Sequence, residues 1–205
     1  MSQPISETLL RACKKNVVSM TPAWADEYAD HLWLDVEASA LHAGSYPIEI
    51  GWCGADLAPV AFLIKPQAKW TIDDWAPDSE RIHGISRAHL FEFGFDAHDV
   101  ANWLNAACTG KIVLSDNPAY DGDWLTQLYH DTGIEQDFEL QDGIDVAGEA
   151  AFFSQLSQSD VDSYIERIKR KFPHPHRAGP DVRRAAAQFL VLAMPHELDA
   201  VLAMA

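Results

Sequence analysis

The segment from His31 to Glu37 constrains the fold of this chain more than any other, because it is both apolar and acidic. It reads His-Leu-Trp-Leu-Asp-Val-Glu, which is typical of a buried β-strand, and Asp35 and Glu37 interrupt it at alternate positions. Alternate side chains of a strand point to one face, so the two carboxylates lie together. Two like charges on a buried strand repel each other and lose hydration, so they need a cation beside them, and hard oxygen ligands favour Mg²⁺ or Mn²⁺. An edge strand with an exposed acidic face is the alternative.

Two other Asp-x-Glu pairs occur in the chain, and their surroundings differ from those of the first. Asp78-Ser-Glu80 follows a proline in a polar segment, and Asp137-Phe-Glu139 lies in an acidic stretch that is typical of a surface. Only the first pair interrupts an apolar strand. It is therefore the candidate for a metal site.

The spacing of apolar residues along the rest of the chain predicts a mixed α/β sheet flanked by helices. Strands are expected at 31–37, 47–54, 58–64 and 111–115, the first three as an antiparallel meander. Helices are expected at 96–107, 121–130, 159–171 and 181–194. Residues 1–30 are expected to form a leader segment with a short helix at 7–15, and residues 31–205 a single domain.

Charge and cysteine content exclude several classes of protein. The chain has 31 acidic and 15 basic residues, and its net charge of -16 argues against a protein that coats nucleic acid or an anionic membrane. Residues 167–205 hold seven basic and three acidic residues, which predicts either a phosphate-binding rim or a solvated helix end. Cys13, Cys53 and Cys108 form no C-x-x-C pair, and no apolar run is long enough to span a membrane. A cytoplasmic protein without a disulfide framework or thiolate zinc site is expected.

A second candidate segment lies where the fourth expected strand leads into a helix. Ligands gather at strand ends in α/β sheets, so Asp121 is a candidate third carboxylate, with Asn117 and Tyr120 beside the approach. Asp116 and Asp123 compete for the role of ligand. Alternatively, Asp121 only caps the helix that is expected to begin there.

A third candidate segment lies near the C-terminus. His176 precedes a helix start at Asp181, and a loop histidine beside a carboxylate is suited to act as a general base next to a metal ligand. His174 lies in the same proline-rich loop and is the rival candidate. A plain surface histidine is the other interpretation.

Taken together, these motifs resemble the DEDDh class of 3′-to-5′ exonucleases, a family with an RNase H-like fold. Asp-x-Glu on the first strand, Asn-x-x-Tyr-Asp at a later strand-to-helix turn and His-x-Ala-x-x-Asp near the C-terminus occur in the family's order. The segment Ile82-His-Gly-Ile-Ser86 also resembles the family's stretch between the first two motifs, and the similarity covers residues 32–189. The family includes RNase T, oligoribonuclease and the proofreading epsilon subunit of DNA polymerase III.

The resemblance implies a role for each matching residue. By position, the ligands of two Mg²⁺ or Mn²⁺ ions per active site are Asp35, Glu37, Asp121 and Asp181, and the general base is His176. The residues expected to bind substrate are Ser39, His83, Asn117, Tyr120 and Arg177. The chain departs from the family at Ala38-Ser39-Ala40, where relatives have Thr-Thr-Gly or a similar sequence, and at Gly179-Pro180 in the last motif.

The expected activity is hydrolysis of single-stranded RNA or DNA from the 3′ end, which releases nucleoside 5′-monophosphates by a two-metal mechanism. The expected partners are single-stranded 3′ ends or short oligonucleotides, because so acidic a body disfavours long duplexes. Two alternatives are a catalytically silent module that binds nucleic-acid ends and a phosphoesterase that acts on dinucleotides or small nucleotides. A homodimer is a further possibility, because the apolar stretch at 189–194 could pack against a partner or its own core.

Overall fold

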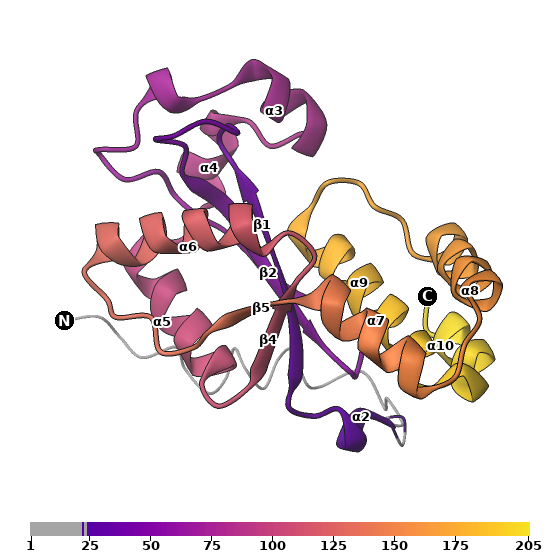
Figure 1. The fold of residues 1–205 in the computed structure, drawn as a ribbon. Coiled ribbons are helices and arrows are strands. Elements are labelled where there is room, and N and C mark those ends of the chain that lie inside the picture. Colours follow the sequence, from indigo (N-terminus) through magenta and orange to yellow (C-terminus); the bar gives the residue numbers. More distant parts are fainter. Residues whose placement is uncertain (1–21, 23) are drawn as a thin grey trace.

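The computed structural model describes Pro22 and residues 24–205, and most of its elements are labelled in Figure 1. The strands are β1 (His31–Ala38), β2 (Pro47–Gly54), β3 (Val60–Leu63), β4 (Ile112–Ser115) and β5 (Leu140–Asp142). The helices are α2 (Trp24–Glu27), α3 (Pro77–His83), α4 (Arg87–Phe93), α5 (Ala97–Cys108), α6 (Pro118–Thr132), α7 (Gly143–Phe153), α8 (Gln158–Lys171), α9 (Ala178–Ala193) and α10 (Leu198–Ala203). Two short 3-10 helices span Ile72–Asp74 and Pro195–Glu197. The helix expected at 7–15 lies outside the described residues.

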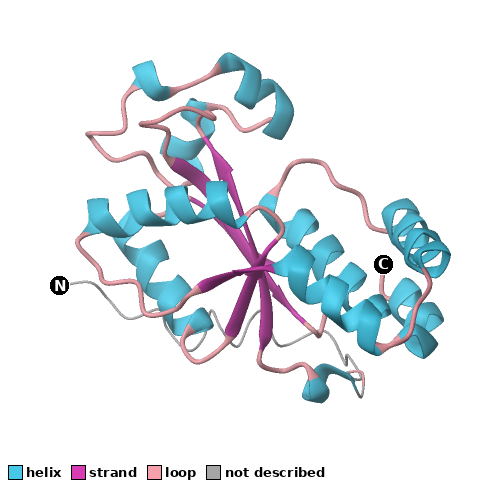
Figure 2. Cartoon of the chain, in the orientation of Figure 1, coloured by secondary structure: helices cyan, strands magenta, loops and turns pink. Residues whose placement is uncertain are grey.

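The five strands form one mixed sheet in the order β3-β2-β1-β4-β5. Strands β1, β2 and β3 pair antiparallel, whereas β4 pairs parallel with both β1 and β5. Helices cover both faces of the sheet, as Figure 2 shows. The expectation of a mixed sheet with three antiparallel first strands, flanked by helices, is therefore confirmed.

The alternation of side chains along β1 divides the core into two layers. Leu32, Leu34 and Val36 pack on the side of α5 and α6. Trp33 points to the opposite face and packs with residues of α9. Because side chains alternate in a strand, Asp35 and Glu37 belong to the face that α9 covers. The register of β1 therefore delivers both carboxylates to the side where α9 begins.

Several elements differ from the expectations. Strand β5 has only three residues and follows an acidic segment, so its sequence gave no strand pattern. Helix α6 begins at Pro118, three residues before the expected start, because proline is tolerated at the first helical position. Helix α9 likewise begins at Ala178 rather than at Asp181. The alternative in which Asp121 only caps its helix is therefore wrong, and the cap position belongs to Asn117.

Apolar residues near the C-terminus pack inside the described chain. Phe189, Leu190, Val191 and Leu192 of α9 are buried in the core layer that also contains Leu198 of α10. Upstream of β1, Trp24 is buried in the same layer and donates a hydrogen bond from Nε1 to the carbonyl of Ala55 at 3.1 Å. Of the helices in the described part of the chain, none is long and apolar enough to cross a membrane.

Candidate active site

Carboxylates from three elements and one loop converge at the carboxyl end of β1. Asp35 and Glu37 come from β1, Asp121 from α6 and Asp181 from the first turn of α9. Asp116 comes from the loop between β4 and α6. Their oxygens form two groups, each with all ligand atoms within 4.8 Å of one another: Asp35 with Glu37 and Asp181, and Asp35 with Asp121 and Asp116. The four predicted carboxylates therefore lie together, and Asp35 is common to both groups.

The electrostatics of this carboxylate cluster are unfavourable without a cation. Burial, followed by the charges of Asp121 and Glu37, raises the pKa of Asp35 well above its ordinary value. Burial raises the pKa of Glu37 to about 8, and the nearby charge of Asp181 adds to this effect. Burial also raises the pKa of Asp121 to about 7. The raised pKa values mean that burial and the neighbouring charges make the ionised forms of these three carboxyl groups unfavourable at neutral pH without a cation.

Two oxygens of the cluster fit a divalent metal. Asp35 Oδ2 and Asp181 Oδ1 are buried, and neither has a hydrogen-bond partner among the described residues. A buried carboxylate oxygen without a partner is costly unless it binds a cation. Carboxylate oxygens are also the ligands that Mg²⁺ and Mn²⁺ prefer. The donor set and the unpaired oxygens therefore suit hard divalent ions.

Asp121 is oriented by Ser115, a residue that the sequence reasoning did not single out. Ser115 is buried at the end of β4, and its hydroxyl donates a hydrogen bond to Asp121 Oδ2. The same hydroxyl oxygen accepts a hydrogen bond from the backbone N–H of Asn117 at 2.9 Å. Of the two competing aspartates, Asp116 joins the cluster, whereas Asp123 is exposed and lines another cavity. Asp116 is therefore an additional candidate ligand.

The loop before α9 carries both histidines. His176 has a positive φ of 56°, is exposed and lines a cavity of about 240 Å³ together with Glu37 and His83. His174 Nε2 lies 3.5 Å from Asp181 Oδ2, and the two histidine rings meet edge to face at 4.8 Å. A ring nitrogen of each histidine and an oxygen of Asp181 all lie within 4.8 Å of one another, so both rings border the carboxylate cluster at Asp181, and His176 also lines the cavity beside Glu37.

One ring nitrogen of His83 is hydrogen-bonded within the fold, and the other has no partner among the described residues. The side chain is only 4% exposed, and its Nδ1 accepts a hydrogen bond from the backbone N–H of Ile85 at 3.0 Å. Burial lowers the pKa of His83, so the ring is neutral and carries its proton on Nε2. Nε2 has no partner among the described residues, and His83 lines the same cavity as His176. The ring therefore lies beside this cavity with a buried N–H group that no described residue accepts.

The other predicted substrate-binding residues have different surroundings. Ser39 is fully buried, and its hydroxyl accepts a hydrogen bond from the backbone N–H of Tyr46 at 3.0 Å, so it holds the β1–β2 turn. Tyr120 is exposed, and its ring lies tilted by 31° to that of Trp124 with centroids 5.6 Å apart. Both rings line a cavity of about 330 Å³. Arg177 pairs with Glu49 of β2.

Ion pairs with acidic neighbours reduce the basic charge near the C-terminus. Arg167 pairs with Asp199, and Lys169 pairs with Glu166. Burial raises the pKa of Asp181, and the nearby charges of His174, His176 and, least, Arg184 oppose this rise. The predicted phosphate-binding rim is therefore only partly available, because several of its charges are already compensated.

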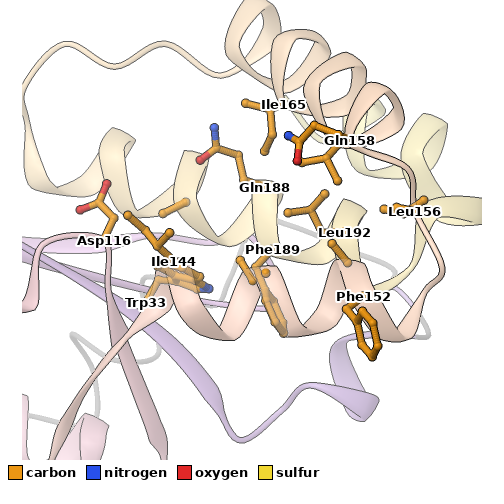
Figure 3. Close-up of a pocket in the computed structure, with 16 residues that line it drawn as sticks. Trp33, Asp116, Ile144, Phe152, Leu156, Gln158, Ile165, Gln188, Phe189 and Leu192 are labelled. Carbon is orange, nitrogen blue, oxygen red and sulfur yellow. The ribbon is translucent and has the colours of Figure 1, made fainter.

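An apolar pocket of about 430 Å³ lies between α7, α8 and α9 (Figure 3). Phe152, Phe189 and Leu192 are among its lining residues, and Gln188 and Asp116 are among its few polar ones. Asp116 also belongs to the carboxylate cluster, so the pocket and the cluster adjoin there. The pocket is far less polar than the cluster, which places the candidate chemistry at the carboxylates.

No protein-family model matches the chain, and the search of curated proteins found no match. Solved structures of exonuclease I do match its fold. E. coli exonuclease I in complex with a dT13 oligonucleotide gives a TM-score of 0.58 at 16% identity, over 83% of this chain and 42% of that one. The zinc ion bound form of the E. coli exonuclease I complex with single-stranded DNA gives 0.57 at 16% identity with the same coverage. Exonuclease I from Methylocaldum szegediense gives 0.54 at 17% identity, over 84% of this chain and 42% of that one.

These comparisons concern the fold. The chain spans 42% of the length of each exonuclease I structure named above, and the identities are 16% to 17%. The matched region covers more than four-fifths of this chain, 83% to 84%, so it includes most of the sheet and helices described above. This protein therefore has the RNase H-like fold of exonuclease I.

Proposed function

We propose that this protein is a divalent-metal-dependent 3′-to-5′ exonuclease that hydrolyses single-stranded nucleic acid to nucleoside 5′-monophosphates. The observation that carries the proposal is the convergence of acidic side chains from separate elements on one shared residue, Asp35. The match of the motifs to the DEDDh family and of the fold to exonuclease I supports the same activity. The exonuclease I structures with dT13 and dA16 oligonucleotides support a single-stranded substrate.

Two groups of carboxylates would hold two Mg²⁺ or Mn²⁺ ions. Asp35, Glu37 and Asp181 form the first group, and Asp35, Asp116 and Asp121 form the second. When bound, two divalent ions would polarise the scissile phosphate, activate the attacking water and stabilise the leaving 3′-oxygen. Ser115 would keep the Asp121 carboxylate in place through its hydrogen bond.

The remaining chemistry belongs to the side chains around the cavity. His176 borders this cavity beside Glu37 and would accept the proton of the attacking water as general base. His83 would donate its free Nε2–H to an acceptor on the terminal nucleotide. The cavity lined by His176 and the one lined by Tyr120 share Leu41 and Trp124, so together they can receive a terminal nucleotide and its neighbour.

The experiment that tests the proposal is a time course with 5′-labelled single-stranded DNA and RNA of matched sequence, in Mg²⁺, Mn²⁺ and EDTA. We expect a ladder that shortens from the 3′ end and disappears in EDTA, and the faster of the two ladders identifies the preferred sugar. No metal-dependent shortening of either strand would contradict the proposal and favour a silent end-binding module. Cleavage confined to dinucleotides would favour the small-nucleotide phosphoesterase.

A pair of histidine variants tests the general base. His176→Ala is expected to lower kcat by about 100-fold or more, in the range measured for general acid–base groups. His174→Ala is the matched control, because it removes the neighbouring imidazole from the same loop. An equal or larger loss of kcat in His174→Ala than in His176→Ala would assign the role of base to His174 instead.

A further inference from the structure

Glu49 is a buried carboxylate that lies outside the candidate metal site. It belongs to β2, it is 4% exposed and it lies directly opposite Glu37 in the pairing of β1 with β2. Glu49 Oε2 accepts hydrogen bonds from Arg177 Nε at 2.9 Å and from the backbone N–H of Ala178 at 3.0 Å. Glu49 Oε1 accepts a hydrogen bond from Arg177 Nη2 at 2.6 Å. Both oxygens are thus engaged, and by only one segment of the chain.

That segment joins His176 to the start of α9. The first N–H groups of a helix have no partner within the helix, and Arg177 at the cap position supplies no side-chain bond to them. Glu49 accepts the N–H of Ala178 from another element, and a carboxylate at this end is also favoured by the helix dipole. Strand β2 therefore caps α9 across a sequence separation of 129 residues.

A second contact fixes the same junction. A Cβ atom on Gly51 would lie 2.8 Å from the carbonyl carbon of Ala178, so the backbone of α9 approaches β2 closely at this glycine. Side chains at alternate positions of β2 share one face, and Glu49 and Gly51 are two such positions. The start of α9 is therefore held on β2 at two successive positions of that face.

The held junction carries two groups of the candidate site. The backbone N–H of Arg177 donates a hydrogen bond to Asp181 Oδ2 at 3.1 Å, while Asp181 Oδ1 has no partner among the described residues and belongs to the carboxylate cluster. On the other side of Arg177, His176 adopts a left-handed φ of 56°, which is uncommon for a residue with a side chain and which the surrounding chain has to support. Anchoring Arg177 therefore restrains both His176 and Asp181.

We propose that Glu49 is a positioning residue that holds Arg177 and the first turn of α9, and thereby sets where His176 and Asp181 stand relative to the metal site. The proposal rests on the proposed function, because it assigns catalytic and ligand roles to those two side chains. Glu49 belongs to neither carboxylate group of the candidate metal site, and three N–H donors from Arg177 and Ala178 hold its two oxygens.

The test compares Glu49→Gln with Asp131→Asn in the full chain. Each variant neutralises one buried carboxylate held by several donors, but Asp131 is near the far end of α6 and its donors include Lys69, Trp70 and Gln127. We expect Glu49→Gln to lower kcat by about 10-fold to 100-fold with KM changed by no more than about twofold, because small misplacements of reacting groups cost this much. Asp131→Asn is expected to lower thermal stability and leave kcat unchanged. An equal loss of kcat in both variants would overturn the positioning role.

Hydrogen exchange of backbone amides gives a readout that needs no activity. In Glu49→Gln the backbone amides of residues 176–182 are expected to exchange faster than in wild type, and those of α5 at the wild-type rate. In Asp131→Asn the amides of residues 176–182 are expected to exchange at the wild-type rate. Unchanged exchange over 176–182 in Glu49→Gln would overturn the proposal. A wild-type protein that does not cleave would refute the proposed function, while the exchange data would still decide whether Glu49 orders this segment.

A double-variant cycle with Arg177→Met tests the route through Arg177. If Glu49 acts through that side chain, the double variant loses no more kcat than the more damaged single variant. If the loss of kcat in the double variant equals the product of the two single losses, Glu49 acts by another route, and the proposal in this form is overturned.

Discussion

At the scale of single residues, the candidate site lies where the sequence breaks its own local pattern. Carboxylates at Asp35 and Glu37 are unfavourable in a strand whose other residues are buried, and such local conflicts are expected at functional positions. The structure brings them together with Asp121 and Asp181. Like charges gathered in a buried site should reduce stability while they create the means to bind cations.

Asp35→Asn tests this conflict between stability and chemistry. In EDTA at pH 8 the variant is expected to be more stable than wild type by about 1 kcal/mol, or about 2 to 4 °C in Tm, because the substitution removes a carboxyl group whose ionised form is disfavoured by burial and by the charges of its neighbours. Thermal unfolding followed by circular dichroism measures the difference. Asp137→Asn is the control, because it makes the same substitution in an exposed Asp-x-Glu pair. A lower Tm for Asp35→Asn than for the control would contradict the expectation.

The Asp131 carboxyl is expected to contribute stability at neutral pH that is lost in acid. Burial favours the neutral form of its carboxyl, but bonds from Lys69, Trp70, His130 and Gln127 outweigh burial and lower its pKa well below the ordinary value. A lowered pKa in the folded state contributes stability above the unfolded pKa of about 4, and this contribution is lost as the pH falls below it. Urea unfolding of wild type and Asp131→Asn measures this contribution as a difference in the free energy of unfolding. The difference should become smaller as the pH is lowered from 5 to 3. A constant difference would contradict this.

At the scale of elements, the sequence predicted strands β1 to β4 and the four longest helices, α5, α6, α8 and α9, and missed β5, α7 and the shorter helices α3, α4 and α10. Strand β2 lies at its expected bounds and β1 extends one residue further, since apolar alternation is a local signal. Strand β5 exists because β4 offers a parallel edge, which no local pattern announces. The start of α9 depends on Glu49 in β2, and the orientation of Asp121 depends on Ser115. These roles come from tertiary contacts, so spacing alone could not reveal them.

Gly51→Ala tests the close approach of β2 and α9. The added methyl group would lie 2.8 Å from the backbone of Ala178, so we expect a loss of about 1 to 3 kcal/mol in the free energy of unfolding, as for other overpacked sites. Gly148→Ala is the matched control, because this glycine lies within α7 and has no atom within 4 Å of an added Cβ. The control should gain about 0.5 to 1 kcal/mol from the higher helix propensity of alanine. Equal effects of the two substitutions would contradict the close approach.

At the scale of the whole molecule, both the net charge and the charge of the carboxylate cluster oppose the binding of a polyanionic substrate. The chain carries a net charge of -16, and its carboxylate cluster adds a concentrated negative field at one end of β1. A polyanionic substrate can approach such a surface only when cations neutralise the site. Binding of divalent ions should therefore be coupled both to substrate binding and to the stability of the fold.

Stabilisation by Mg²⁺ should depend on pH. Burial raises the pKa of Glu37 to about 8 and that of Asp121 to about 7, so the folded metal-free protein holds protons that the unfolded chain releases near pH 4. The stability contributed by these groups is present in full at low pH and is lost as the pH rises to 8. Mg²⁺ requires the ionised carboxylates, so the rise in Tm on adding Mg²⁺ should be larger at pH 8 than at pH 5. An equal rise at both values would contradict the metal assignment.

The most direct measurement compares Asp35→Asn with Asp137→Asn in cleavage of a 5′-labelled single strand in Mg²⁺. Asp35 is the residue that both ligand groups share, whereas Asp137 is exposed and belongs to neither. We predict that Asp137→Asn degrades the strand from its 3′ end at the wild-type rate, and that Asp35→Asn is slower by at least about 100-fold, as when a main electrostatic group of an active site is removed. Degradation by Asp35→Asn at the wild-type rate would show that the carboxylate cluster is not the hydrolytic site.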